Sequence, residues 1–126
     1  MKKIIISLGI FVIMIVGMIF SILYLNKVCK DLEDITSNIE SYINEDNMKK
    51  AYDTSQSLTK KWKKYSESIS IFVNHQEIDN IETELSKIPQ YIKEDSKDEA
   101  LASVRVLNFF LNHVKNMEKI TIQNIF

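Results

Sequence analysis

Residues Ile4–Leu25 carry no charged side chain, and only three residues precede them. This run matches the roughly 20 helical residues that are required to cross the hydrocarbon core of a bilayer. The apolar part of a secretory signal peptide is shorter, about 7–15 residues, and it ends at a small-residue cleavage site. No such site is found around Ser21–Leu25. We therefore expect residues 1–25 to be an uncleaved transmembrane signal anchor that places the protein in the cell membrane.

Lysines flank the run on both sides. Lys2 and Lys3 lie before it with the amino terminus, and Lys27 and Lys30 lie after it, where three acidic residues follow at once. Because cytoplasmic segments next to a membrane-spanning helix carry an excess of Lys and Arg, the charges favour a cytoplasmic amino terminus. We expect a single-pass topology in which residues 26–126 form an extracytoplasmic domain.

The chain beyond the run is slightly acidic. Of the 16 Lys and Arg residues, two precede the run, and the remaining 14 stand against 17 Asp and Glu residues, a formal charge of −3. A nucleic-acid binder normally needs a basic face that neutralises phosphates, so nucleic-acid binding is not expected. A single cysteine forbids an intramolecular disulfide, and about a hundred residues suffice for one modest core. The sequence predicts one domain that is stabilised by packing alone.

Helix-breaking residues are rare, because both glycines lie inside the apolar run and Pro89 is the only proline. Apolar and small residues recur at steps of three and four, which places each set on one seam of a helix. We expect an all-α fold in which the transmembrane helix is followed by an antiparallel four-helix bundle built from two helical hairpins. The four stripes are Leu25, Val28, Leu32, Ile35, Ile39 and Tyr42; Ala51, Ser55, Leu58, Trp62, Tyr65, Ile69 and Phe72; Ile78, Ile81, Leu85, Ile88 and Ile92; and Ala100, Val104, Leu107, Leu111 and Val114.

The limits of the helices follow from capping residues and breakers. No breaker separates the apolar run from the first stripe, so one helix is expected from about residue 4 to about 45. Pro89 is expected to kink the third helix or to loosen its last turn. Residues 120–126 are rich in β-branched side chains, and we expect an extended tail that docks on the bundle. The predicted caps are Asp46 or Asn47 for the second helix, Asn74 with Glu77 for the third, and Ser96 with Glu99 for the fourth.

Part of the sequence recurs at a separation of 49 residues, which is a whole number of heptads. The shared pattern is Tyr-Ile, one residue, Glu-Asp, four residues, then Ala. Either a duplication of one hairpin or a shared heptad composition explains the pattern. The matched residues are Ile39, Tyr42, Ile43, Glu45, Asp46, Ala51 and Leu58 in the first copy, and Ile88, Tyr91, Ile92, Glu94, Asp95, Ala100 and Leu107 in the second.

Three features give the chain a family resemblance. These are Trp62, the stretch of residues 72–79 (FVNHQEID) and the terminal Asn124-Ile125-Phe126. With them, the whole chain resembles domain-of-unknown-function family 4363, whose members are small single-pass membrane proteins of Gram-positive bacteria with an extracytoplasmic helical domain. The resemblance implies no activity. It implies that Trp62, His75, Asn124 and Phe126 are candidate partner-binding residues.

His75 and His113 are the only candidates for metal or acid–base chemistry. If the last two helices pair antiparallel around residues 95 and 96, residue 113 lies opposite residue 78, and both imidazoles lie toward the same end of the bundle. We favour a helix-capping role for His75 and a position at the rim of the bundle for His113. The reason is that neither His-x-x-x-His nor Glu-x-x-His spacing, which is typical of metal sites, occurs within one helix. No metal and no cofactor is expected. The carboxylates that could join the histidines in the alternative, a metal site, are Glu77, Asp79 and Glu118.

Other reactive patterns are better explained by structure. Ser57 and Lys60 form a literal Ser-x-x-Lys pattern, but no partner motif follows, so we do not expect an enzyme. Cys29 is expected to be a buried thiol, with acylation or an intermolecular disulfide as alternatives. Lipidation of the lipoprotein type requires small uncharged residues before the cysteine. It is not expected here, because Asn26, Lys27 and Val28 precede Cys29. Trp62 is expected in the core, and the four lysines around it are expected to be solvated rather than to bind acidic lipids or partners.

Three classes of function remain. We favour a membrane-anchored interaction module that binds an integral membrane protein or a second copy of itself. The alternative is an extracytoplasmic bundle that senses a ligand or metal, and it would need a signalling partner because three residues cannot provide a cytoplasmic output. The third class, a hydrolase or metalloenzyme, lacks a set of catalytic residues. The biological process is not indicated by any residue pattern.

Overall fold

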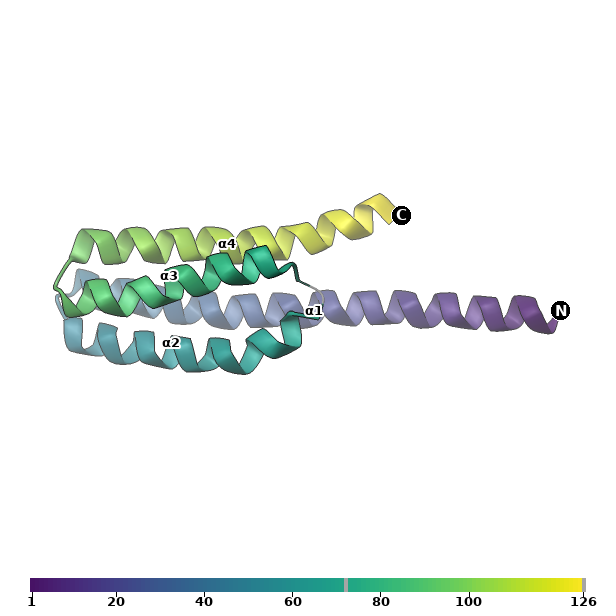
Figure 1. Cartoon of the computed structure of the whole chain (residues 1–126), viewed down its shortest axis with the longest axis horizontal. Coiled ribbons are helices and arrows are strands. Elements are labelled where there is room, and N and C mark those ends of the chain that lie inside the picture. The colour runs from purple at the N-terminus through teal and green to yellow at the C-terminus, as the bar shows by residue number, and fades with distance from the viewer. Residues whose placement is uncertain (72, 126) are drawn as a thin grey trace.

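The fold consists of four long helices joined by short connections (Figure 1). The computed structural model describes the backbone of residues 1–71 and 73–125, and the side chains of residues 1–71 and 73–117. The elements are α1 (Lys2–Asn44), α2 (Met48–Ile69), α3 (His75–Lys93) and α4 (Lys97–Ile125). The described residues contain no strand. The predicted all-α class is confirmed.

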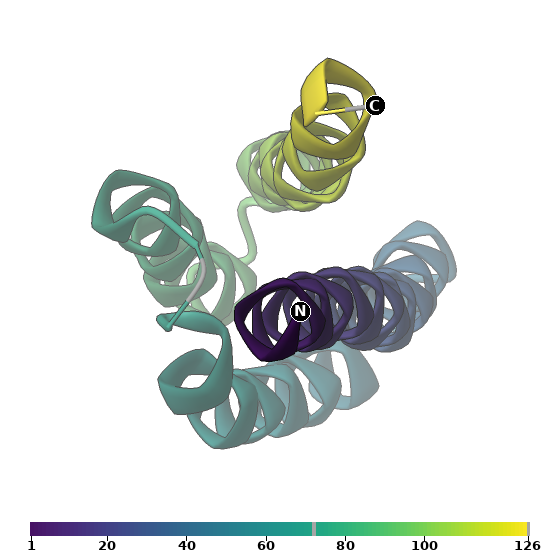
Figure 2. The same ribbon diagram turned by 90° about the vertical axis from the view of Figure 1, so that its right-hand side faces the viewer.

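The helices form an antiparallel bundle (Figures 1 and 2). Each helix packs against the next one in the sequence, and α4 closes the bundle against α1. Seen along the axis in Figure 2, the four helices lie at the corners of a quadrilateral, with the two hairpins α1–α2 and α3–α4 side by side. This arrangement confirms the predicted bundle of two helical hairpins.

Helix α1 is continuous and longer than the others. Its first half protrudes from the bundle, and its apolar side chains there are exposed. This helix is long and apolar enough to cross a membrane. Within its most apolar stretch of 18 residues, no residue is buried in the protein. The core begins at Leu25, which is fully buried. The predicted domain boundary between residues 25 and 26 therefore has no break in the backbone, and the predicted single helix from about residue 4 to about 45 is confirmed.

The predicted seams form the core. Among the described stripe residues, Ile35, Tyr42 and Tyr65 lie partly buried at the edge of the core, and all the others are buried. Phe72, which was predicted to belong to the second stripe, lies outside the described residues. Small residues also occupy seam positions on α2 and α4. The buried ones include Ala51, Ser55, Ala100 and Ser103.

The two turns at the far end of the bundle have the same conformation. Asp46 and Asp95 both adopt a left-handed backbone, with φ of 61° and 59°. The Asp46 amide donates to the carbonyl of the residue three positions earlier at 3.1 Å, and so does that of Asp95. The next amide, of Asn47 or Ser96, donates to a tyrosine carbonyl five positions earlier at 2.8 Å in both turns. The 49-residue repeat in the sequence is thus a structural repeat, and an ion pair between Lys97 and Asp46 joins the two turns.

The connection between α2 and α3 lies at the opposite end, where α1 leaves the bundle (Figure 1). The Val73 amide donates to the Ile69 carbonyl at 2.9 Å, and both side chains are buried. Asn74 caps α3, since its side chain accepts a hydrogen bond from the Gln76 amide at 2.9 Å. Val73 before the cap and Ile78 four residues after it are buried in the same core cluster, the arrangement of a hydrophobic staple. Ile69, Val73 and Asn74 are therefore held by hydrogen bonds and by packing in the core.

Two sequence expectations about helix ends are wrong. Residues 120–125 do not form an extended tail, because α4 is helical to Ile125. Extending an existing helix adds one hydrogen bond per residue, whereas β-branched residues cost only a few tenths of a kcal/mol each. Glu77 does not close a capping box on Asn74, because its carboxylate faces α4 instead. Asn47 is confirmed as the cap of α2, and α3 continues through Pro89 to Lys93.

Candidate functional site

The most unusual surface of the bundle is an apolar stripe on α4. We call Val106, Phe109, His113 and Met117 the α4 stripe. At 100° per residue these positions fall within about 80° of one another on the helix. Three of them are exposed large apolar side chains, and Phe109 keeps 64% of its surface accessible. Exposed apolar residues gathered on one face of a protein mark interaction sites more often than singly scattered ones do.

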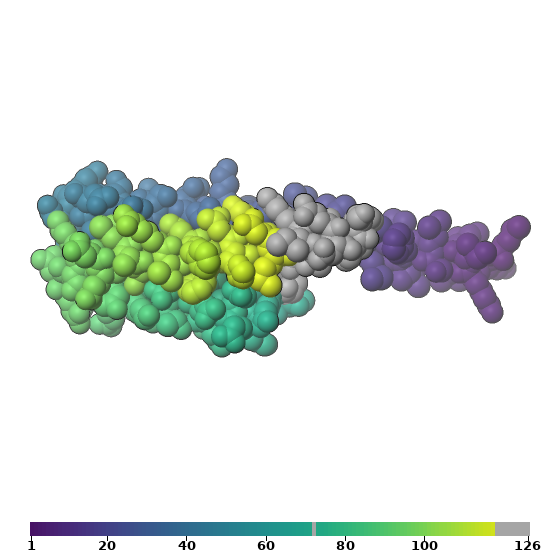
Figure 3. All heavy atoms as spheres, turned by 90° about the horizontal axis from the view of Figure 1, so that it is seen from above, coloured from purple at the N-terminus to yellow at the C-terminus, as the bar shows by residue number. Residues whose placement is uncertain are grey.

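The stripe lies on the outer face of α4, and His113 is its member in contact with α3. The His113 Nε2 lies 3.5 Å from the Glu77 Oε1 of α3, and the imidazole stacks on the Phe109 ring with centroids 6.1 Å apart. The ring of Phe110, which is half-buried, meets Phe109 edge-on at 5.9 Å. Figure 3 looks onto α4 and shows its outer face uncovered between α1 and α3. The aromatic part of the stripe is thus fixed by the groups beside it.

The sequence analysis missed the stripe apart from His113. The residues lie outside the heptad seam of α4, so they did not enter the predicted core. The sequence did contain a signal for the stripe, because α4 has more large apolar residues than its buried seam uses. An amphipathic helix needs only one apolar face, so the additional residues indicate a second one. Val106, Phe109 and Met117 are surplus to the seam that Ala100, Val104, Leu107, Leu111 and Val114 form.

Trp62 is a core residue with a polar contact at its edge. The side chain is buried, as predicted, and its Nε1 donates to the Glu82 Oε1 of α3 at 3.2 Å. An open hollow of about 260 Å³ adjoins this contact, and it is lined by Thr59, Trp62, Lys63, Glu82, Leu85 and Ser86. The four lysines around Trp62 are exposed, which agrees with their predicted solvation. Trp62 therefore joins α2 to α3, and only its edge is available to a partner.

Polar groups also cross between α1 and α4. The Thr36 hydroxyl is buried and lies 2.7 Å from the side-chain oxygen of Asn108. One turn nearer the apolar run, Lys115 Nζ lies 3.9 Å from Glu33 Oε2. The other carboxylate oxygen of Glu33, Oε1, is buried without a hydrogen-bond partner, and the same holds for Glu77 Oε2 on the α3 side. These contacts fix the register of α4 against α1.

Cys29 is buried beside this polar contact, as predicted. Burial raises the pKa of the Cys29 thiol from 9.0 to about 12, and the nearby Glu33 adds to the rise. A thiol with such a pKa stays protonated at neutral pH, and the thiolate is the reactive form. The chemistry of this site is therefore that of an inert core residue.

The two histidines lie at the end of the bundle where α1 emerges. The contact between His113 and Glu77 confirms the predicted pairing of residue 113 with residue 78 to within one residue. His75 is the first residue of α3 and is exposed. Among the described residues no group of three or more His, Cys, Asp or Glu side chains could hold a metal ion. The side chain of Glu118, which the alternative metal hypothesis includes, lies outside the described set.

The remaining candidates are at the carboxyl end. Asn124 lies in the last turn of α4, and its side chain is outside the described residues. Phe126 is outside the described residues altogether. Their proposed role in partner binding stays a prediction. Of the four partner-binding candidates, only Trp62 and His75 have described side chains.

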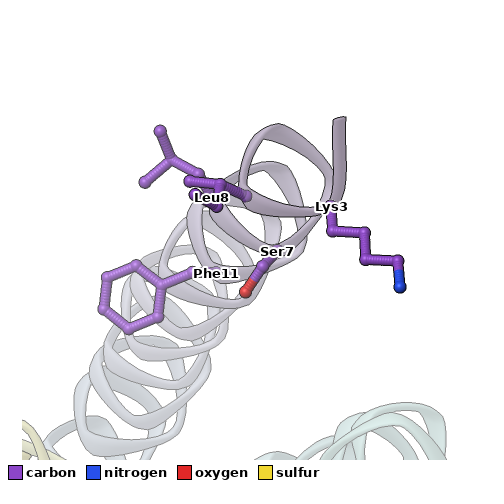
Figure 4. Close-up of a pocket in the computed structure, with 5 residues that line it drawn as sticks. Lys3, Ser7, Leu8 and Phe11 are labelled. Carbon is purple, nitrogen blue, oxygen red and sulfur yellow. The ribbon is translucent and has the colours of Figure 1, made fainter. Parts of the chain in front are cut away.

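A further hollow lies at the start of α1, shown in Figure 4. It is lined by Lys3, Ile4, Ser7, Leu8 and Phe11, which all belong to the same helix. The side chains of Lys3, Leu8 and Phe11 spread outward from that helix (Figure 4). A hollow on one exposed helix cannot enclose a small molecule, so this is the outer surface of α1 rather than a ligand pocket.

Most of the chain matches a known protein family. A family model described as a domain of unknown function, DUF4363, matches residues 19–125. The chain belongs to this family. The match covers the end of the apolar run and all four helices of the bundle, and it confirms the resemblance that was drawn from Trp62, residues 72–79 and the terminal residues. No curated protein and no solved structure matches the chain.

Proposed function

We propose that this protein is a membrane-anchored helical interaction module that docks onto an integral membrane protein or onto a second copy of itself. The observation that carries the proposal is the α4 stripe, in which Phe109 is 64% exposed beside the exposed Val106 and Met117. Aromatic side chains and methionine are enriched in protein–protein interfaces. A surface of this kind is suited to a partner protein rather than to a small molecule.

The apolar half of α1 supports the membrane anchor. Residues 4–25 in a helix extend about 33 Å at 1.5 Å per residue, which fits a hydrocarbon core about 30 Å thick. Most of their side chains are exposed, up to the buried Leu25 at the end of the run, which is a costly arrangement in water and a favourable one in lipid. The positive charges of Lys2 and Lys3 favour a cytoplasmic amino terminus and an extracytoplasmic bundle.

The register of α4 sets the height of the stripe above the bilayer. The contacts Thr36–Asn108 and Glu33–Lys115 place Met117 level with about residue 29 of α1, and Val106 level with about residue 40. The stripe then spans roughly 6–22 Å beyond Leu25 along the continuous α1 helix, at 1.5 Å per residue. A partner that reaches this zone must itself lie close to the membrane surface, which favours another membrane protein or a second copy.

A sensing function ranks second. Its support is the open hollow of about 260 Å³ beside Trp62 and Glu82. That volume lies below the range of about 300–1,000 Å³ that is usual for ligand pockets.

Site-specific photocrosslinking in cells tests the interaction function. A photoreactive amino acid is introduced at Phe109, and at Lys61 as a matched exposed control on α2. We expect Phe109 to give a defined adduct and Lys61 to give none. An adduct of twice 14.7 kDa identifies a second copy, and another mass identifies a different partner. No adduct from Phe109, or the same adducts from both positions, would refute the proposal.

A further inference from the structure

One apolar side chain outside α1 and α4 is almost fully exposed. Ile71, in the connection between α2 and α3, keeps 85% of its surface accessible. This exposure exceeds that of every large apolar side chain in the apolar run, where Ile13 has the highest value, 72%. A soluble bundle gains nothing from an isoleucine in this position, because contact with water is unfavourable for its side chain.

The structure presents Ile71 outward in a fixed way. Its neighbours Ile69 and Val73 are buried on either side, and the Val73 amide is hydrogen-bonded to the Ile69 carbonyl. The staple of Val73 and Ile78 fixes the entry into α3. Ile71 therefore cannot exchange places with a core residue without breaking these contacts, and its exposure is a property of the folded connection.

The level of Ile71 along α1 follows from the hairpin. The Tyr65 hydroxyl donates to the Asp31 Oδ2 at 3.1 Å, which sets residue 65 of α2 beside residue 31 of α1. Continuing both antiparallel helices by four residues sets Ile69, the last residue of α2, beside residue 27 of α1. Counting instead from the turn at Asp46 sets Ile69 beside residue 23, and Ile71 follows two residues later in the connection. Both estimates put Ile71 level with the last turn of the apolar run, where α1 leaves the bundle (Figure 1).

The same level has the composition of a membrane boundary. Tyr24 lies at the end of the apolar run, and tyrosine is enriched where hydrocarbon meets the headgroups. Lys27 and Lys30 follow within the next two turns and are exposed, so their ammonium groups lie at the height of the lipid headgroups. An apolar side chain at this height meets acyl chains instead of water.

We propose that Ile71 makes a second contact with the bilayer, in which its side chain inserts at the boundary between headgroups and hydrocarbon. This inference rests on the proposed anchoring of α1 in the membrane. With α1 as the first point of attachment, the second restricts both the tilt of the bundle and its rotation about the α1 axis. The bundle then presents the α4 stripe in one direction parallel to the membrane plane.

Fluorescence quenching by lipids tests the contact. In a Cys29→Ala background, the full chain carries an environment-sensitive fluorophore through Ile71→Cys, through Ile13→Cys in the apolar run, or through Lys49→Cys at the far end of α2. Each protein is reconstituted into phosphatidylcholine vesicles without a quencher, with lipids that bear a doxyl quencher near the headgroup, and with lipids that bear it near the end of the acyl chain, which reaches the depth of Ile13. Helical circular dichroism equal to that of the unlabelled protein shows that the variants are folded.

We expect the label at Ile71 to emit at shorter wavelength than the label at Lys49, and to lose fluorescence in the quencher vesicles. Quenching at Ile13 without quenching at Ile71 would overturn the second contact and leave the anchor intact. A lack of quenching at Ile13 would refute the anchor, and the second contact with it. Equal quenching at Lys49 and Ile71 would mean that the bundle lies flat on the membrane, which also contradicts the proposal.

Discussion

The structural repeat makes a quantitative prediction about Ile39 and Ile88. The two residues are 49 positions apart, they occupy equivalent places in α1 and α3, and both are 0% exposed. If the two hairpins are built alike, Ile39→Ala and Ile88→Ala should reduce the free energy of unfolding by similar amounts. The comparison tests whether both hairpins contribute equally to one cooperative core.

The magnitude follows from the buried side chain. Each substitution removes three carbon atoms from a fully buried position, a loss of roughly 2.4 kcal/mol at about 0.8 kcal/mol per carbon. The cavity left behind adds to this loss, and Ile→Ala substitutions in cores cost about 2–5 kcal/mol in total. We expect about 3 kcal/mol for each variant. Against a total stability of about 5–15 kcal/mol for a domain, such a loss is large.

Urea unfolding of the full chain in a mild non-ionic detergent measures the effect. The buried Trp62 is the only tryptophan and reports on the core by its fluorescence. With a slope of about 1–1.5 kcal/mol per molar urea for a domain of this size, each variant should lower the midpoint by about 2–3 M. Ile71→Ala removes the same atoms from an exposed position, and it should change the stability by less than about 0.5 kcal/mol.

Unequal losses would refute the reasoning. If Ile39→Ala costs about 3 kcal/mol and Ile88→Ala costs less than about 1 kcal/mol, the hairpin of α3 and α4 is not part of the same cooperative core. If both cost as little as Ile71→Ala, the burial of these seams does not stabilise the fold.

Three further predictions concern single contacts. Trp62→Phe removes the hydrogen bond to Glu82 between α2 and α3. The free energy of unfolding should fall by about 1–2 kcal/mol, as measured by thermal unfolding followed by circular dichroism. An unchanged melting temperature would show that the contact does not stabilise the fold. Cys29 should react with a thiol reagent at pH 8 about a thousand times more slowly in the native protein than in urea, because the pKa of about 12 instead of 9.0 reduces the thiolate fraction by three powers of ten. The stabilisation linked to this thiol is present below pH 9.0 and is lost as the pH rises toward 12, since the unfolded chain releases the proton first; Cys29→Ala should weaken this loss. Phe109→Ser should leave the urea midpoint within about 0.5 kcal/mol of the parent while abolishing the contact made by the α4 stripe, and a large loss of stability would assign Phe109 to the core instead.

The sequence by itself determined the helical elements and their seams. Periodicity and capping are properties of the local backbone, so the core positions Ile39 and Ile88 and the caps Asn47 and Asn74 could be read from residue order alone. The apolar run and the continuity of α1 belong to the same class, because both depend on consecutive residues. The near-identical turns at Asp46 and Asp95 follow from the repeated Tyr-Ile-x-Glu-Asp pattern.

Only the tertiary structure decided which surplus apolar residues remain uncovered. Phe109 and Phe110 are neighbours in the sequence, but only Phe110 packs against the core, because burial depends on the helices beside each ring. Glu77 could close a cap by local rules, and it meets His113 of α4 instead. Ile71 and Val73 belong to one short connection, and the packing of α3 buries one and exposes the other. Burial is decided by contacts between residues far apart in the chain, and local sequence patterns do not contain that information.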